Sequence, residues 1–277
     1  MTPTYSVVIP WCDRRDLLVT LEKNRAIYER HAAEIVVVNA GGDYQALTAL
    51  VETAGVSNVR CIDLPGAVFN RSLCANIGAM VSRGEIVFLL DADIVLDSDV
   101  LAEAGQCFEN GGRYVTIRRI LESQVESTNK DGPDMSFLAE LRETRELLTV
   151  DGRRAVLRHV TSPGRAAGDG LILVKKHDLL EVGGLNSMLT GWGYEDTDFQ
   201  LRLQFVLGLE RMEAGEVTHL THRSGPRDLA SWRRNMALSA GNYNRQHYKG
   251  SFDDDERAWT GKYREVCTNH ASPAANV

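Results

Sequence analysis

The sequence predicts an α/β fold built on a mostly parallel sheet, and three observations support that prediction. Short β-branched runs alternate with longer amphipathic stretches through the first hundred residues. The runs are continuously apolar, as expected of parallel strands covered by helices on both faces. Turn residues and carboxylates follow the ends of the runs, where such sheets bind ligands. Strands are therefore expected at Tyr5–Ile9, Ile35–Asn39, Val59–Ile62 and Ile86–Leu90.

Helices are expected to connect these strands. Amphipathic spacing places them at Arg14–Arg30, Tyr44–Ala54, Arg71–Arg83 and Asp99–Asn110. Farther along, the same spacing rules predict a strand at Gly170–Val174 and helices at Asp178–Val182, Glu195–Leu207 and Arg227–His247. The acidic run Ser251–Glu256 is expected to be a solvated linker, and Asn269–Val277 a frayed tail.

The stretch 118–165 breaks this alternation. It is charged and carries a helical pattern around Met135–Leu148. An acceptor-binding excursion, a mobile loop and an oligomer contact all fit such a stretch, and we favour the first. The sequence leaves the oligomeric state open.

The composition is that of an ordinary globular protein. The 277 residues are 43% hydrophobic and 25% charged, with a formal net charge of −7, and the length allows one large domain or two small ones. This acidic balance argues against nucleic acid as the main partner. Five widely spaced cysteines favour reduced thiols over a disulfide framework. There is no membrane-spanning apolar run and no signal-peptide pattern at the start, so the cytoplasm is the expected compartment.

Two carboxylates, Asp91 and Asp93, follow the apolar run that ends at Leu90. Burial and mutual repulsion make such a pair costly unless a cation or several hydrogen-bond donors balance it. A divalent metal bound to a diphosphate would do so. The alternative is that one aspartate caps the following turn while the other is exposed.

A second cluster is Gly191-Trp192-Gly193-Tyr194-Glu195-Asp196-Thr197-Asp198. Glycines around a tryptophan imply close backbone packing or unusual dihedral angles. The three carboxylates that follow fall in the first turn of a helix, where one or two would serve as capping residues. The tryptophan could hold a sugar face while a carboxylate accepts a hydroxyl proton.

His219 and His222 form a third cluster. If the strand before them ends near Leu220, both imidazoles can reach one ion; the alternative is a pair of core or surface histidines. Mixed carboxylate, imidazole and phosphate ligands suit Mn²⁺, with Mg²⁺ or Co²⁺ as substitutes. A fourth cluster begins at Phe69 and Arg71, at the start of a helix. These two could stack on and hydrogen-bond a base, or could simply be a staple residue and a surface arginine.

Taken in order, these clusters resemble the nucleotide-sugar glycosyltransferases of the GT-A fold. The likeness is to the family 2 group, and especially to the β-1,4-galactosyltransferase and chondroitin-polymerase type. It is carried by Val8-Ile9-Pro10, Phe69-Asn70-Arg71 with Asn76-Ile77-Gly78, Asp91-Ala92-Asp93, Gly183-Gly184-Leu185, the Gly-Trp-Gly-x-Glu-Asp-x-Asp block, and His219 with His222. The resemblance implies a Rossmann-like, mostly parallel mixed sheet flanked by helices in a single catalytic domain, 1–277.

The resemblance also implies roles for individual residues. Asp196 would be the general base and Glu195 would position hydroxyls. Asp93 and His222 would bind a metal that bridges the diphosphate, with His219 as a third candidate ligand. The substrate would be held by Phe69 and Arg71 at the uracil, Asp91 near the ribose, and Trp192 and Gly193 at the sugar and acceptor. These families often carry an acidic pair or an arginine-rich stretch after the early strands, which this chain lacks; its candidates there are Pro10, Arg14, Asn39 and Asp63.

These assignments predict an inverting, Mn²⁺-dependent transfer of a hexose or N-acetylhexosamine from a UDP-sugar donor. The acceptor would be a glycan, small molecule or peptide, as in polysaccharide biosynthesis. The domain would comprise a nucleotide-binding half (1–117), a variable excursion (118–168), an acceptor- and metal-binding half (169–250) and a C-terminal tail (251–277). A catalytically silent sugar-nucleotide- or glycan-binding homologue is one alternative, and a nucleotidyltransferase or metal-dependent hydrolase is another. Pro10–Arg14 is not the glycine-rich loop that a nucleotidyltransferase needs.

Overall fold

The computed structural model describes residues 3–109, 111–124, 142–160, 165–166, 168–222, 228–243 and 248–268. The strands of its main sheet are β1 (Tyr5–Trp11), β2 (Glu34–Ala40), β3 (Val59–Leu64), β4 (Ile86–Leu89), β5 (Ile94–Leu96), β6 (Arg113–Glu122), β9 (Arg165–Ala166), β10 (Ile172–Lys175), β11 (Glu210–His219) and β12 (Arg264–Thr268). The helices are α1 (Asp16–Arg30), α2 (Tyr44–Ala54), α3 (Arg71–Val81), α4 (Val100–Phe108), α5 (Lys176–Glu181), α6 (Glu195–Leu207), α7 (Leu229–Tyr243) and α8 (Phe252–Trp259).

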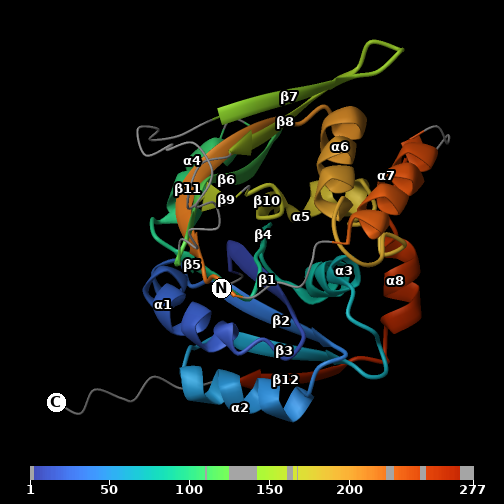
Figure 1. The fold of residues 1–277 in the computed structure, drawn as a ribbon. Coiled ribbons are helices and arrows are strands. Elements are labelled where there is room, and N and C mark those ends of the chain that lie inside the picture. Colours follow the sequence, from blue (N-terminus) through green and yellow to red (C-terminus); the bar gives the residue numbers. More distant parts are fainter. Residues whose placement is uncertain are drawn as a thin grey trace, which may run out of the picture.

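The strands pair in the order β12-β3-β2-β1-β4-β10-β6-β11-β5, and β9 pairs with β6 (Figure 1). Strands β3, β2, β1 and β4 are parallel, and β6 is parallel to β11. Strands β12, β10 and β5 join this framework antiparallel. The expected α/β class, with a mostly parallel mixed sheet flanked by helices, is confirmed.

Two apolar cores lie on opposite faces of the sheet. Alternation along β1 sends Val7 and Ile9 into one core and Val8 into the other. Helices α1, α2 and α4 cover the first core, and α3, α5, α6 and α8 cover the second. Both faces of the central strands are therefore buried, which explains why the strands are apolar throughout.

Two of the expected local structures are wrong. Residues 142–148 of the expected helix around Met135–Leu148 form strand β7, paired antiparallel with β8 (Arg154–Val160); residues 135–141 lie outside the described part of the chain. The segment Arg142–Leu148 is helix-compatible by composition, but the partner strand decides its conformation. This hairpin extends beyond the main sheet (Figure 1).

The expected linker Ser251–Glu256 is the second error. It opens helix α8, which lies beside α3 (Figure 1). Asp255 is buried and accepts hydrogen bonds from Asn76 Nδ2 at 2.7 Å and Ser187 Oγ at 2.8 Å. The carboxylates at 253–255 also occupy a helix start, where the peptide dipoles favour negative charge. Beyond α8, Arg264–Thr268 adds β12 to the sheet, and Asn269–Val277 lies outside the described residues.

The carboxyl ends of β1, β2, β3 and β4 lie at one edge of the sheet because these strands are parallel. Each end leads into a loop that carries expected site residues. Within the described ranges, no helix is long and apolar enough to cross a membrane.

Gly78 allows α3 to approach β1 closely. A Cβ at this position would lie well inside contact distance of Val8 Cγ1 and 3.2 Å from Val38 Cγ2. We expect Gly78→Ala to lower the free energy of unfolding by about 1–3 kcal/mol through overpacking. The matched control is Gly241→Ala in α7, where a Cβ meets no described atom within 4 Å; that change should be neutral or stabilising by up to about 1 kcal/mol. Chemical denaturation of both variants checks this, and equal effects would contradict it.

Candidate active site

The carboxylate of Asp93 lies at the centre of a cluster of nitrogen atoms. The residue is 5% exposed. Arg14 Nη2 donates a hydrogen bond to Asp93 Oδ2 at 2.6 Å. The same oxygen lies 3.3 Å from His222 Nε2 and 3.6 Å from His219 Nε2. Three of the residues singled out in the sequence as metal ligands, together with Arg14, are therefore brought together.

Sheet pairing explains how residues more than a hundred positions apart meet here. Strand β11 runs antiparallel to β5, and this register places His219 opposite Ile94, next to Asp93. The backbone N–H of Leu220 donates to the carbonyl of Asp93 at 2.8 Å. The His-x-x-His segment is thus bound to the Asp-x-Asp segment by main-chain hydrogen bonds.

The charged groups in this cluster shift one another's pKa values. Burial alone would raise the pKa of Asp93, but the contact with His219 and the charges of His219, Arg14 and His222 hold it below its ordinary value. The contact with Asp93 raises the pKa of His219 to about 9, against the opposing effect of burial, and Glu122 adds to the rise. The guanidinium group of Arg14 and the imidazole of His219, whose pKa is raised, thus offset the charge of the buried carboxylate.

The donor set suits a divalent cation. Ligand atoms of Asp93, His219 and His222 all lie within 4.8 Å of one another. One carboxylate oxygen and two imidazole nitrogens are ligands that Mn²⁺ and similar ions accept. His222 Nδ1 is buried and has no hydrogen-bond partner among the described residues, while Nε2 contacts Arg14. A cation bound to these atoms would replace Arg14 at Asp93.

Arg71 joins the second carboxylate of the Asp-x-Asp segment to the start of α6. It is the first residue of α3, and Asn70 caps that helix by accepting a hydrogen bond from the N–H of Leu73 at 3.1 Å. Arg71 Nε donates to Asp91 Oδ1 at 2.9 Å, and Nη1 lies 3.9 Å from Glu195 Oε1. Its Nη2 donates to the carbonyl of Gly170 at 2.6 Å.

Glu195 and Asp196 open helix α6 beside this arginine. Burial, reinforced by repulsion from Asp196, raises the pKa of Glu195 to about 7, while Arg71 opposes the rise. Asp196 Oδ1 accepts a hydrogen bond from the N–H of Thr197 at 2.6 Å. A carboxyl group with a pKa near neutrality can exchange protons with substrate hydroxyls.

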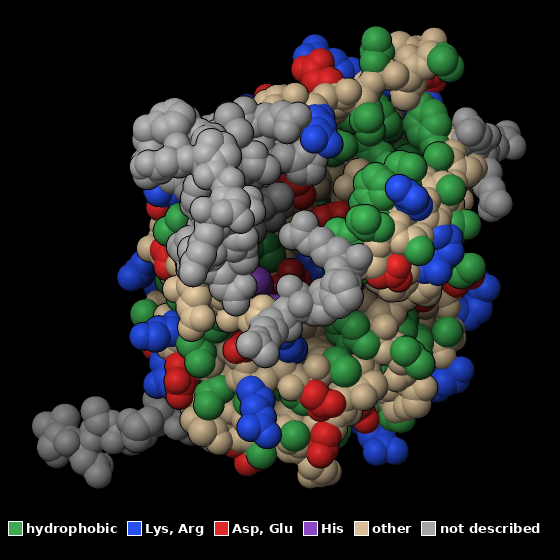
Figure 2. Space-filling model, in the orientation of Figure 1, with side chains coloured by type: hydrophobic (Ala, Val, Ile, Leu, Met, Phe, Trp, Pro, Cys, Tyr) green, Lys and Arg blue, Asp and Glu red, His purple; other side chains and the backbone are tan. Residues whose placement is uncertain are grey.

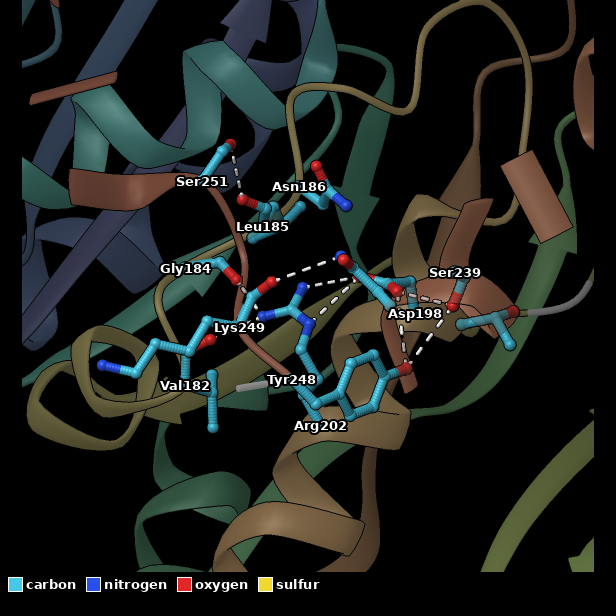
Figure 3. Close-up of polar contacts among 12 residues, drawn as sticks. Val182, Gly184, Leu185, Asn186, Asp198, Arg202, Ser239, Tyr248, Lys249 and Ser251 are labelled. Carbon is cyan, nitrogen blue, oxygen red and sulfur yellow. Dashed lines mark hydrogen bonds and ion pairs between the residues drawn. The ribbon is translucent and has the colours of Figure 1, made fainter. Parts of the chain in front are cut away.

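The third carboxylate of the motif, Asp198, has a different place. It is fully buried and pairs with the equally buried Arg202, whose Nη2 lies 2.7 Å from Asp198 Oδ2 (Figure 3). Ser239 Oγ donates to Asp198 Oδ1 at 2.6 Å. Arg202 Nη1 donates to the carbonyls of Val182 and Gly184. Asp198 is thus a buried structural anchor.

The loop before α6 packs closely on α7. Gly191 and Gly193 have positive φ angles of 78° and 87°, and a Cβ on Gly193 would come within 2.9 Å of Trp232 Cδ1. Asn235 Nδ2 donates to the carbonyl of Gly193 at 2.8 Å. Trp192 remains 42% exposed at the end of this loop. The close packing expected from the two glycines is present.

Tyr194 adopts φ 75°, a backbone conformation that a bulky side chain rarely accepts. Its ring makes an edge contact with Trp232, with the centroids 5.7 Å apart. Strain of this kind persists only where the surroundings impose it. The start of α6 is therefore held firmly in place.

The other expected substrate residues lie at neighbouring strand ends. Asn39, at the end of β2, donates through Nδ2 to Asp63 Oδ1 on β3 at 2.8 Å, and both residues are buried. Pro10 is buried near the end of β1. Phe69 is 46% exposed, with no contact to Arg71 among the described interactions. Figure 2 shows acidic and histidine side chains at the bottom of a hollow in the middle of this face.

Sequence reasoning missed two contributors, Glu122 and Gly170. Glu122 Oε2 lies 2.8 Å from His219 Nδ1. Glu122 falls in the stretch 118–165, where the regular alternation of strands and helices was lost, whereas Gly170 opens the expected strand Gly170–Val174. One signal in the sequence could have indicated Glu122. It is a polar residue at the end of a strand whose residues Tyr114–Ile117 and Ile120 are buried.

Residues 157–223 match a family model described as the N-terminal domain of galactosyltransferase. No curated protein sequence matches the chain. Among solved structures it is similar to GalNAc-T7 with UDP, GalNAc and Mn²⁺, at 14% identity and a TM-score of 0.61, covering 87% of this chain and 48% of that one.

Two further structures are similar. TarS of S. aureus has 15% identity and a TM-score of 0.53, over 94% of this chain and 43% of that one. The mannosyltransferase PcManGT of Pyrobaculum calidifontis, in complex with GDP-Man and Mn²⁺, has 14% identity and a TM-score of 0.53, over 95% and 76%. The chain spans about half the length of the first two proteins. The fold is that of the GT-A glycosyltransferases, which confirms the resemblance to the GT-A fold seen in the sequence.

The raised pKa of Glu195 should make the stability of the fold depend on pH. Its pKa is raised from 4.5 to about 7 in the folded chain, so ionisation opposes folding. The free energy of unfolding should therefore fall as the pH rises from about 4.5 to about 7. Glu195→Gln should be more stable than the parent at pH 8, by up to about 3 kcal/mol, with no such gain at pH 4. Denaturation at the two pH values without nucleotide or metal checks this; the same gain at both would contradict it.

Proposed function

We propose that the protein is an inverting, metal-dependent glycosyltransferase that moves a hexose or N-acetylhexosamine from a UDP-sugar to an acceptor hydroxyl. The acceptor would be a glycan, a small molecule or a peptide. The convergence of Asp93, His219 and His222 carries the proposal, together with Arg71, which joins Asp91 of the same Asp-x-Asp segment to Glu195 at the start of α6. Two similar structures, GalNAc-T7 with UDP, GalNAc and Mn²⁺ and PcManGT with GDP-Man and Mn²⁺, support it.

The donor diphosphate would lie next to Asp93. When bound there, Mn²⁺, or Mg²⁺ or Co²⁺ in its place, would supply positive charge to the leaving diphosphate. Asp93, His219 and His222 would hold the ion. Arg14, released from Asp93, would be free to pair with phosphate oxygens, which its guanidinium group matches.

The nucleoside would extend over the strand ends beyond the diphosphate. Asn39 and Asp63 form a buried polar pair there, with Pro10 at the end of the neighbouring strand β1. Phe69 and Arg71 are proposed to contact the uracil, and Asp91 the ribose. Arg71 contacts Asp91 and Glu195, so it would also hold these carboxylates in place.

Transfer would be a single displacement at the anomeric carbon. Asp196 would accept the proton of the acceptor hydroxyl while the acceptor oxygen bonds to that carbon and the bond to UDP breaks. Attack opposite the leaving group inverts the configuration. Glu195 would position hydroxyl groups of donor or acceptor, and Trp192 with Gly193 would line the sugar and acceptor site. The exposed ring of Trp192 suits the apolar face of a sugar.

UDP binding should depend on metal and on Asp93. In calorimetric titrations with UDP, we expect Mn²⁺ to tighten binding by the parent chain and to have no effect on Asp93→Ala. The matched control, Asp97→Asn, changes an exposed aspartate of the same segment and should behave like the parent. Metal-independent UDP binding by the parent, or Mn²⁺-dependent binding by Asp93→Ala, would refute the proposed metal site.

Asp196→Asn should retain Mn²⁺-dependent UDP binding and lose about 10²- to 10⁴-fold in transfer rate, because the amide cannot accept the hydroxyl proton. Screening UDP-sugars with candidate acceptors for UDP release identifies the reaction in which the rate is then measured. Asp253→Asn, at the exposed first turn of α8, is the control. Wild-type turnover by Asp196→Asn would remove it as the base, and absence of UDP release by the parent with every acceptor would favour a catalytically silent binding protein.

A further inference from the structure

Glu122 lies directly behind one of the proposed metal ligands. It ends β6, and the parallel register with β11 places it opposite His219. Glu122 Oε2 lies 2.8 Å from His219 Nδ1 and accepts a hydrogen bond from Thr221 Oγ1 at 2.9 Å. The carboxylate is partly buried. Its two contacts, with His219 and Thr221 of the same segment, set its position.

Main-chain and side-chain hydrogen bonds hold the two strand ends together around this contact. The N–H of Ser123 donates to the carbonyl of His219 at 2.9 Å, and the N–H of Thr221 donates to Ser123 Oγ at 2.9 Å. Glu122 therefore has little freedom to leave His219. The contact is a built part of the fold.

The contact between Glu122 and His219 bears on metal binding, because the two nitrogens of an imidazole ring depend on each other. A histidine binds a metal through a nitrogen that carries no proton, and the opposite nitrogen then carries one. A carboxylate at Nδ1 accepts that proton in a hydrogen bond, fixes the ring orientation and makes the other nitrogen a better ligand. In this structure Nδ1 faces Glu122 and Nε2 faces Asp93, 3.6 Å from its Oδ2.

We propose that Glu122 is a positioning residue of the metal site: it holds His219 with Nε2 directed at the ion and thereby sets the affinity for a divalent cation. The inference rests on the proposed metal-dependent function. The two histidines differ at Nδ1: that of His219 contacts Glu122, whereas that of His222 has no hydrogen-bond partner in the described part of the chain. His219 would be the ligand oriented through its second nitrogen, whereas among the described residues the second nitrogen of His222 has no such partner.

Calorimetric titration of the full chain with Mn²⁺ alone tests the proposal. We expect Glu122→Ala to bind Mn²⁺ about 10- to 100-fold more weakly than the parent. Glu122→Gln, whose amide oxygen can still accept from Nδ1, should lose less. Thr221→Val, which removes the second donor to Glu122 and keeps the carboxylate, should lie between the parent and Glu122→Ala. Glu210→Gln is the matched control, because it removes an exposed carboxylate from the other end of the same strand pair.

A second measurement separates positioning from damage to the fold. UDP binding by Glu122→Ala should return to the parent value once Mn²⁺ is saturating, whereas a distorted site would bind UDP poorly at every Mn²⁺ concentration. Unchanged Mn²⁺ affinity in Glu122→Ala, or UDP binding that saturating Mn²⁺ does not restore, would overturn the role of Glu122. If the parent itself bound no Mn²⁺, with or without UDP, the metal dependence under the proposed function would fail, and this inference with it.

Discussion

The buried ion pair between Asp198 and Arg202 is the interaction on which the position of helix α6 depends. Two charges without access to water are costly unless further hydrogen bonds complete the pair. Here those bonds come from two carbonyls and two hydroxyls, on Val182, Gly184, Ser239 and Tyr248. The pair therefore ties α6 to the loop after α5, to α7 and to the segment before α8. Glu195 and Asp196 begin the same helix, so this network sets where their carboxylates lie.

The sheet performs the corresponding task for the nitrogen ligands. Strand β11 lies between β6 and β5, so its last residue meets Glu122 on one side and the segment of Asp93 on the other. Main-chain hydrogen bonds fix both registers, and a shift of one residue would turn His219 to the opposite face. Arg71 then links the two halves, because it contacts Asp91 beyond β4 and Glu195 on α6. The geometry of the site thus follows from backbone pairing and two arginines.

Local signals in the sequence predicted the elements whose first and last residues are determined by their immediate neighbours in the chain. Helix α2 was located correctly from its amphipathic spacing, and in the structure Asp43 caps its start and Gly55 ends it in a left-handed conformation. The bounds of α6 were also predicted correctly. The strand β7 and the helix α8 were missed, because the pairing of β7 with β8 and the burial of Asp255 against Asn76 depend on distant partners. The role of Glu122 was not predicted for the same reason, because its contact with His219 joins residues 97 positions apart.

Strand β12 has a consequence for the behaviour of the chain in solution. It covers the outer edge of β3, whose unpaired amides would otherwise offer a template for intermolecular pairing. Among the described strands β12 is the outermost at this edge, and it carries exposed charged residues, Arg264 and Glu265; Arg60 on β3 binds Glu265 at 2.6 Å. Charged residues on an edge strand discourage β-sheet addition by another molecule. We therefore expect β12 to discourage intermolecular strand pairing at this edge, which is opposite the strands that bring the histidines to Asp93.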